Sequence, residues 1–258
     1  MRSFVLLSIV VLGLPAQAIV RRHDVPDSRY REAARGLDAV VDMNLPGGAG
    51  TLIAPEWVLT AAHVTVLFKS PHEVIVGGER VAVKRVVAYP GGREGRHDLA
   101  LVQLARAVTN VAPLPLYEKR DEEGATITVA GRGFSGDGLQ GPVERDRVFR
   151  AATNRIDRVL ESWLVFRFDA PPEGTALEGI SGPGDSGGPA LLTVDGKVFV
   201  AGVSSGQDDR GQGKEGVYGV DEYYVRVSSY LEWIAQSSAH TPRGTTGAPP
   251  AGRHGRQR

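Results

Sequence analysis

Short apolar stretches alternating with turn residues fill the first half of the chain. They lie at residues 40–41, 51–54, 57–59, 73–76, 81–88 and 99–104, and Pro46-Gly47-Gly48 is one of the turns between them. Apolar runs of this length, broken by Gly and Pro, are typical of antiparallel strands. We therefore expect one small β-barrel over residues 37–110.

A second set of apolar stretches follows a break in the pattern. Residues 112–124 hold two prolines and a charged run, and they predict a crossover between two halves. The later stretches, at residues 126–130, 147–152, 163–168, 190–193, 197–204 and 223–227, predict a second barrel over residues 125–227. Only residues 228–237 show helical spacing, with Ser228 available as an N-cap. The expected fold class is all-β, with two packed antiparallel barrels and a C-terminal helix.

The two ends of the chain differ from the body. Residues 1–18 combine a charged start, an apolar run and Ala16-Gln17-Ala18, which together predict a secretory signal peptide cleaved after Ala18. The run is shorter than the roughly 20 apolar residues that span a bilayer, although a retained anchor is the alternative. Residues 238–258 are rich in Gly, Pro, Ala and Arg and predict a flexible basic tail. We expect a secreted protein, extracellular or periplasmic, with no stable membrane association.

Composition excludes several function classes. Hydrophobic residues make up 41% and charged residues 23%, which is inconsistent with a mostly disordered chain. The 30 basic and 30 acidic residues balance, so nothing indicates a nucleic-acid partner. Cysteine is absent. A zinc site of His63, His72 and His97 is not expected, because no short-spaced ligand pair accompanies them. We expect no metal and no cofactor, and a monomer is the default.

The stretch from Gly182 to Pro189 carries the candidate chemistry. It reads Gly-Pro-Gly-Asp-Ser-Gly-Gly-Pro, with Ser186 in a glycine-rich turn. A hydroxyl is a poor nucleophile at neutral pH, so a reactive serine needs a base and donors for the developing oxyanion. His63 follows an apolar strand and Asp98 begins another, so the chain holds the parts of a base-activated serine. The adjacent His97 is an alternative partner for Asp98, but neighbouring residues of an extended chain point to opposite faces.

Three strings in this order resemble the chymotrypsin/trypsin family of serine proteases: Thr-Ala-Ala-His at 60–63, Asp-Leu-Ala-Leu at 98–101, and Gly-Asp-Ser-Gly-Gly-Pro at 184–189. The resemblance implies two six-stranded barrels over residues 19–236 and a catalytic triad of His63, Asp98 and Ser186. It implies a serine endopeptidase that acts on protein or peptide substrates through an acyl-enzyme. The family's oxyanion hole corresponds to the backbone N–H groups of Gly184 and Ser186. The absence of cysteine favours a bacterial secreted member.

The resemblance also implies an ion pair at the start of the mature chain. Cleavage after Ala18 would leave Ile19-Val20 as the new terminus, and the family's pattern pairs the Ile19 ammonium with Asp185. Maturation would then need no separate activation cleavage. Arg21-Arg22 stands where the family usually has two glycines, and Ile19-Val20 as a mere end of the apolar region is the alternative.

The substrate preference implied by the resemblance depends on how this sequence is aligned with the family's pocket residues. The family's spacing places Ile180 at the base of the pocket for the P1 side chain, the residue preceding the cleaved bond. Gly206 and Gly216 then form the walls, and Ser204 matches the serine that bonds the triad aspartate. This alignment predicts apolar or small P1 side chains. A second alignment, which starts from the strand at residues 224–227, brings Asp221 or Glu222 into the pocket and predicts basic P1 side chains.

Two other functions are compatible with parts of the sequence. Gly-x-Ser-x-Gly around Ser186 also fits the nucleophile elbow of α/β-hydrolases, but the only histidines after it, His240 and His254, lie in the tail, and strand-like sequence follows where that fold needs a helix. A catalytically inactive protease fold kept for binding is the second alternative. Because all three triad residues are present, the sequence favours the enzyme.

Overall fold

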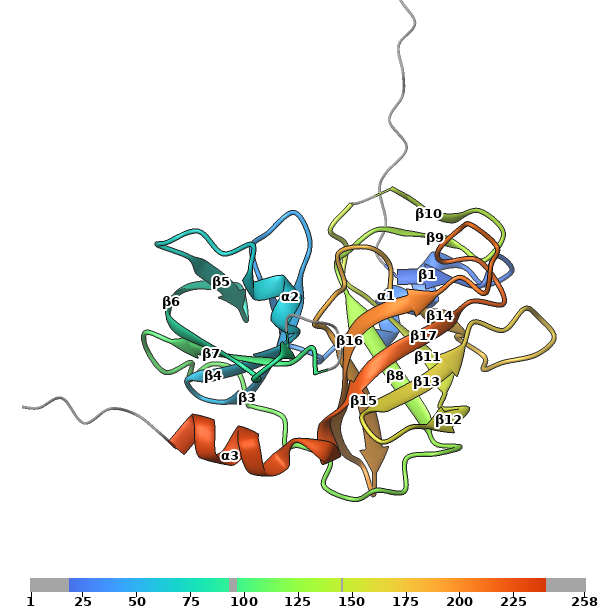
Figure 1. Cartoon of the computed structure of the whole chain (residues 1–258). Helices are drawn as coiled ribbons and strands as arrows, with labels where there is room; N and C mark the ends of the chain where they lie inside the picture. The colour runs from blue at the N-terminus through green and yellow to red at the C-terminus, as the bar shows by residue number, and fades with distance from the viewer. Residues whose placement is uncertain (1–18, 93–96, 145, 240–258) are drawn as a thin grey trace, which may run out of the picture.

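The computed structural model describes residues 19–92, 97–144 and 146–239. The predicted signal peptide and nearly all of the predicted tail lie outside this part. Figure 1 shows two β-rich halves side by side, with a C-terminal helix beneath the first. In the described part, no helix has the length and apolar character needed to cross a bilayer.

The first half is a closed barrel of six antiparallel strands. Its order is β2-β3-β4-β7-β6-β5, and the pair Asp42 and Ile75 closes it. The strands are β2 (Val40–Asp42), β3 (Ala49–Ala54), β4 (Trp57–Thr60), β5 (Glu73–Val76), β6 (Glu79–Ala88) and β7 (Ala100–Leu104). The alternation of apolar and turn residues thus gave the correct strands, and the six-stranded first barrel is confirmed.

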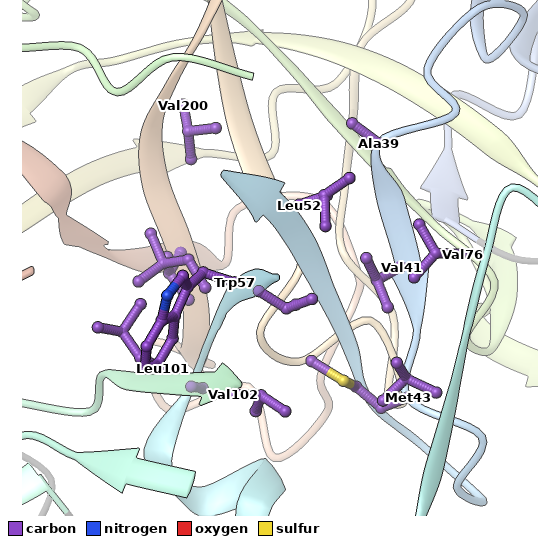
Figure 2. Packing of buried hydrophobic residues seen from close by; sticks show 14 of the residues in the cluster. Ala39, Val41, Met43, Leu52, Trp57, Val76, Leu101, Val102 and Val200 are labelled. Carbon is purple, nitrogen blue, oxygen red and sulfur yellow. The ribbon is translucent and has the colours of Figure 1, made fainter. Parts of the chain in front are cut away.

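The core of this barrel continues into the second half of the molecule. Figure 2 shows Leu52, Val41 and Leu101 packed inside the barrel, with Val200 approaching from a strand of the second half. Val203 and Val225 from that half belong to the same buried cluster. Apolar surface removed from water contributes roughly 25 cal/mol per Å². A shared core therefore holds the two halves in one relative position, which any site between them requires.

The second half is a seven-stranded antiparallel sheet in the order β11-β8-β15-β16-β17-β13-β12. The strands are β8 (Thr126–Gly131), β11 (Arg150–Arg155), β12 (Arg158–Val159), β13 (Trp163–Arg167), β15 (Pro189–Val194), β16 (Lys197–Asp208) and β17 (Asp221–Arg226).

The two edge strands of this sheet, β11 and β12, are successive pieces of one stretch of chain. Between them the N–H of Ile156 donates to Ala125 and the N–H of Asp157 to Val165, on opposite sides. The stretch therefore contributes to both edges, which is why six expected strands appear as seven. The chymotrypsin-like fold class is confirmed.

A third, small sheet was not expected. It has the order β10-β9-β1-β14 and consists of β1 (Ile19–Arg21), β9 (Ser135–Asp137), β10 (Gly141–Glu144) and β14 (Gly179–Ile180). Strand β1 pairs parallel to β9 and antiparallel to β14. These strands are too short to show an alternating pattern. Their pairing buries Ile19 and Val20 completely.

The helices near the two ends of the described chain differ from the prediction. A helix α1 (Asp27–Ala33) was missed; it packs on β11, and its Asp27 bonds the buried Arg150. The terminal helix α3 (Leu231–Ala239) starts later than expected, after a 3-10 turn at Val227–Ser229. Ser228 does not serve as the cap, because its hydroxyl donates to Glu122 in the crossover at 2.7 Å. Glu122 also pairs with Arg226, so these side chains tie the crossover to β17.

Candidate active site

His63 and Asp98 face each other from neighbouring elements of the first barrel. His63 lies in the one-turn helix α2 (Ala62–Thr65) directly after β4, and Asp98 precedes β7, which pairs with β4. The Nδ1 of His63 is 2.6 Å from Oδ2 of Asp98, and the backbone N–H of His63 donates to Oδ1 at 2.9 Å. The His63 side chain is 42% exposed, whereas that of Asp98 is 6% exposed. This two-point contact fixes the imidazole and leaves its other edge open.

The environment of Asp98 keeps it ionised. Burial opposes the charge, but hydrogen bonds from His63 and from the hydroxyl of Ser205, at 2.7 Å, outweigh it and hold the pKa of Asp98 below its usual value. An ionised carboxylate accepts only, so it selects the imidazole tautomer with the proton on Nδ1. The Nε2 atom of His63 is then free to accept a proton.

Ser186 lies in the turn between β14 and β15, against the first barrel. Its carbonyl accepts from the N–H of Ala49 at 2.7 Å, and the N–H of Gly187 donates to Ser204 at 2.8 Å. Gly187 has a φ of 79°, and a Cβ there would lie 2.2 Å from the Thr60 hydroxyl, so only glycine allows this approach. The two halves of the molecule meet at this turn.

A continuous chain of contacts joins the three predicted residues. It runs from Ser186 through Gly187 to Ser204 and its neighbour Ser205, and from the Ser205 hydroxyl to Asp98 and His63. In the part of the chain described, no hydrogen bond joins the Ser186 hydroxyl to His63. Such contacts are often long in sites without substrate.

The N–H groups of Gly184 and Ser186 suit an oxyanion hole. Both residues line the cavity beside the Ser186 side chain. Neighbouring N–H groups of the turn are used internally: Asp185 donates to Gly182, and Gly188 donates to Asp185. Within the described ranges, the N–H groups of Gly184 and Ser186 donate to no protein acceptor. They are therefore available to a negatively charged oxygen.

The carboxylate of Asp185 is buried behind this turn and lies next to Ile19, the partner predicted for it. It accepts N–H groups from Gly133 at 2.6 Å and Gly182 at 2.9 Å, and further backbone donors from Ile19 and Arg132. Burial raises the pKa of Asp185 to about 6, despite these four donors. The structure thus brings Ile19 and Asp185 together, with the Ile19 nitrogen as an amide in the continuous chain.

Two features around Ile19 stand out. Its φ is 64°, in the left-handed region that a β-branched residue rarely adopts. Ser135 pairs with Ile19 across β9 and β1, and its hydroxyl is buried without a hydrogen-bond partner among the described residues. A buried polar group without a partner is uncommon in folded proteins.

The cavity beside Ser186 has a volume of about 270 Å³ and differs from the predicted pocket. Of the residues predicted for the P1 pocket, Ser204 and Gly206 line this cavity, whereas Ile180 and Gly216 do not. Ile180 is fully buried, because β14 pairs it with Val20 and turns it into the core. Gly216 lies behind the wall, where its N–H donates to the side chain of Gln207 at 2.9 Å.

Ser204 is not the serine that contacts Asp98. Strand β16 has a bulge between Ser204 and Gly206, so Ser205 is an extra residue without a partner in β17. A bulge changes the direction of a side chain. It directs the Ser205 hydroxyl to Asp98, whereas the Ser204 hydroxyl lies 3.2 Å from that of Ser181.

The main sequence prediction missed Glu222, which the alternative alignment had named. Strand β17 begins at Asp221 and pairs directly with β16, as that alignment required. Glu222 is fully buried in the cavity wall and accepts hydrogen bonds from the hydroxyl of Ser181 and, at 2.9 Å, from Gln207. Burial raises the pKa of Glu222 to about 8. An apolar P1 preference based on Ile180 therefore loses its structural basis.

The other histidines have separate partners. The Nδ1 of His97 lies 2.7 Å from the Tyr230 hydroxyl, so His97 does not compete for Asp98. The Nε2 of His72 lies 2.8 Å from the carbonyl of Met43. In the described ranges, no group of three or more His, Asp or Glu side chains is arranged to hold a metal ion.

Comparisons with known proteins show which proteins this chain is similar to. A family model described as Trypsin matches residues 29–234. A protein of Corynebacterium glutamicum (strain R) described as an uncharacterized peptidase is 27% identical over 253 residues, covering 93% of this chain and 80% of its own length. Transmembrane protease serine 11A of Homo sapiens is 30% identical over 218 residues (76% of this chain, 50% of its own), and vitamin K-dependent protein C of Mus musculus is 29% identical over 215 residues (72% and 45%). The chain spans about half the length of these two animal relatives.

Proposed function

Because the chain belongs to the trypsin family and is a serine-type endopeptidase, we propose that it cleaves peptide bonds with Ser186 as nucleophile, His63 as general base and Asp98 as the residue that positions His63. The substrate is a protein or peptide. The observation that carries this assignment is the two-point contact of Asp98 with His63, beside the cavity that Ser186 lines.

The proposed reaction follows from the free atoms of the site. The Nε2 of His63 takes the Ser186 proton while Oγ forms a bond to the carbonyl carbon, and the carbonyl oxygen becomes an oxyanion. The N–H groups of Gly184 and Ser186 bind that oxygen, and each such donor is worth about 2.7–4 kcal/mol in comparable sites. His63 then gives its proton to the leaving amine as the C–N bond breaks. Water, deprotonated by His63, hydrolyses the remaining ester and restores Ser186.

Hydrolysis of internally quenched peptides tests this function. We expect the wild type to cleave members of a mixed P1 library, and Ser186→Ala and His63→Ala to lose at least about 1,000-fold in kcat. Ser186→Ala should unfold at the wild-type temperature, because the Ser186 side chain is not part of the buried core. His63→Ala should lose about 1–3 kcal/mol of stability at most, because the buried Asp98 loses its Nδ1–H donor but keeps the other two. If wild type and Ser186→Ala are equally inactive on the whole library, the protein is an inactive protease fold that binds rather than cleaves.

We also propose that cleavage after Ala18 matures the enzyme during export. Among the described residues, the hydrogen bonds to the buried carboxylate of Asp185 come from backbone amides, and one of these amides belongs to Ile19. A free amine at Ile19 would place a positive charge there, and the Ser135 hydroxyl is an additional acceptor next to it. Cleavage would also relieve the backbone strain at Ile19, because the first residue of a chain has no φ angle. A residue held in a rarely populated backbone conformation costs on the order of 1–3 kcal/mol.

The N-terminus of the active protein tests this maturation. We expect secreted, active enzyme to begin at Ile19. We expect a variant with one added alanine before Ile19 to fold but lose most activity, because the charged amine no longer reaches Asp185. Active enzyme that begins at any other residue would refute the ion pair while leaving the triad proposal in place.

A further inference from the structure

We propose that the cavity between β2 and the segment after β8 is a binding site for a free α-amino acid with an apolar side chain. The carboxylate of the ligand binds the guanidinium of Arg132, and its ammonium faces the carboxylates of Asp38 and Asp42. The Ser186 hydroxyl takes no part in this site. The inference is therefore independent of the proposed catalytic function.

The cavity has a volume of about 300 Å³, and its wall comes from both halves of the molecule. The first half contributes residues of β2, those just before it and the turn between β5 and β6, and the second half contributes Arg132, Arg147 and Phe149. Cavities that hold small molecules are commonly about 300–1,000 Å³. None of the described lining residues belongs to the cavity beside Ser186. A ligand here would contact both halves without entering the proposed active site.

Arg132 lines this cavity with a charged group that the described part of the protein leaves unpaired. Its Cζ lies 4.2 Å from the centre of the Phe149 ring, which holds the guanidinium at the cavity wall. Within the described ranges, no acceptor bonds this group, and Asp42 acts on it only from beyond ion-pair distance. Burial lowers the pKa of Arg132, although arginine stays protonated at physiological pH. Its N–H groups are therefore free to bind a ligand.

The buried arginines of the described chain differ from Arg132 because they have acidic partners. Arg150 binds Asp27, and Arg226 binds Glu122. A charge removed from water without a partner costs stability. A guanidinium matches a carboxylate well, because two parallel N–H groups bond its two oxygens. The unpaired Arg132 is therefore suited to the carboxylate of a ligand.

The other charges of the cavity wall disfavour a simple anion. Arg132 and Arg147 come from the second half, whereas Asp38 and Asp42 come from the first. A carboxylate without a positive charge would be repelled by the two acids, and an amine without a negative charge would be repelled by the two arginines. A ligand with both charges, separated by one carbon atom, is attracted at each end. An α-amino acid has this arrangement.

Apolar residues complete the wall. Leu37, Val40 and Ile75 lie in the lining beside these charges, all from the first half. Apolar surface that a ligand buries against them adds to its affinity. L-Leucine combines an aliphatic side chain with both charges, so it is the probe that we would use.

Three ligands that share an isobutyl group and differ in charge test the ligand class. Calorimetric titration would compare L-leucine, 4-methylpentanoate and 3-methylbutylamine. The secreted protein would carry Ser186→Ala, so that self-cleavage does not interfere. We expect L-leucine to bind at least about 10-fold more tightly than either singly charged compound, because each of these lacks one charged contact. At about 100 times its Kd, L-leucine should raise the unfolding temperature by about 5–10 °C.

Three variants assign the binding to this cavity. Arg132→Met should weaken L-leucine binding by about 10- to 100-fold, and without ligand it should unfold no lower than the parent protein, because it removes an unpaired charge. Asp42→Asn keeps the acceptor for the N–H of Asn44 and should weaken binding of L-leucine but strengthen that of 4-methylpentanoate. Arg85→Met is the matched control: Arg85 also lies over an aromatic ring, that of Trp57, but it does not line the cavity. It should bind L-leucine as the parent protein does.

Labelling of Ser186 shows whether the ligand lies in the proposed cavity. In the wild type, L-leucine should not slow the reaction of Ser186 with a fluorophosphonate, because the two cavities share no described lining residue. Slowing at concentrations near the Kd would place the ligand beside Ser186 and overturn the proposal. If no serine is labelled but the binding results are as expected, the catalytic proposal fails and this one stands.

Three binding results would also overturn the proposal. The first is a Kd of L-leucine above about 10 mM. The second is equal binding of L-leucine by Arg132→Met and by the parent protein. The third is equal binding of 4-methylpentanoate and L-leucine, which would exclude an amino acid as the preferred ligand class.

Discussion

Replacing Asp98 with asparagine tests whether this residue sets the proton position on His63. The two Asp98 oxygens accept from three donors: Nδ1 and the backbone N–H of His63, and the Ser205 hydroxyl. An amide has one accepting oxygen and one donating nitrogen. With its oxygen toward the His63 backbone, its NH2 group faces Nδ1 and forces the proton onto Nε2. His63 then holds a proton where it has to accept one.

The size of the expected effect separates this role from simple packing. Loss of one or two hydrogen bonds to a charged group costs about 1.5–3 kcal/mol each, or roughly 10- to 100-fold per bond. A base locked in the wrong tautomer lowers kcat by about 10,000-fold in triads of this kind. We therefore expect Asp98→Asn to reduce kcat by about 10,000-fold with little change in KM or in the unfolding temperature.

Steady-state kinetics on a quenched peptide, together with thermal unfolding, measure these quantities. Ser205→Ala removes one donor to Asp98 but leaves the His63 contact, so it serves as the matched control and should cost no more than about 100-fold. A kcat for Asp98→Asn within about 30-fold of the wild type, with the fold intact, would refute the tautomer argument.

Three further changes probe the support around the site. Asp185→Asn should lower kcat/KM at least about 100-fold, because it removes the negative charge that pairs with the Ile19 amine. The wild type should lose activity above about pH 8, as this amine loses its charge. A wild-type activity that does not change with pH in this range would contradict the ion pair. Gly187→Ala should abolish labelling of Ser186 by a fluorophosphonate, because its Cβ would lie 2.2 Å from the Thr60 hydroxyl. Arg226→Met should destabilise the fold by about 3–5 kcal/mol in urea unfolding, because it leaves Glu122 charged and buried; a loss under about 1 kcal/mol would count against that ion pair.

The sequence predicted the strands that follow a repeated apolar pattern and the candidate site residues that lie in short continuous motifs. The strands of both halves show apolar stretches between turns, and His63, Asp98 and Ser186 each lie in a short motif whose neighbours fix the backbone. The structure places these motifs on one chain of contacts. Helix α1 was missed because its stabilising contacts are distant in sequence: Asp27 pairs with the buried Arg150, and Tyr30 is buried in the core of the second half. No local pattern reveals such a pair.

The residues of the pocket were predicted less well. Counting along the chain from Ser186 assumes that the paired strands keep one register without a bulge. One bulged residue in β16 moves the contact with Asp98 from Ser204 to Ser205. Ile180 belongs to a two-residue strand, whose side-chain direction depends on its pairing with Val20 rather than on its own sequence. The alternative alignment found Glu222 because it started from the long strand β17. For assigning pocket residues, position in a well-defined strand was therefore more accurate than the number of residues counted from Ser186.

The most direct test of the central claim is covalent labelling of the folded, mature protein with a fluorophosphonate, followed by mass spectrometry of the modified peptide. We expect one adduct, on Ser186, which is absent in Ser186→Ala and forms far more slowly in His63→Ala. An adduct on another serine, or no adduct between pH 6 and 9 in protein that begins at Ile19, would contradict it.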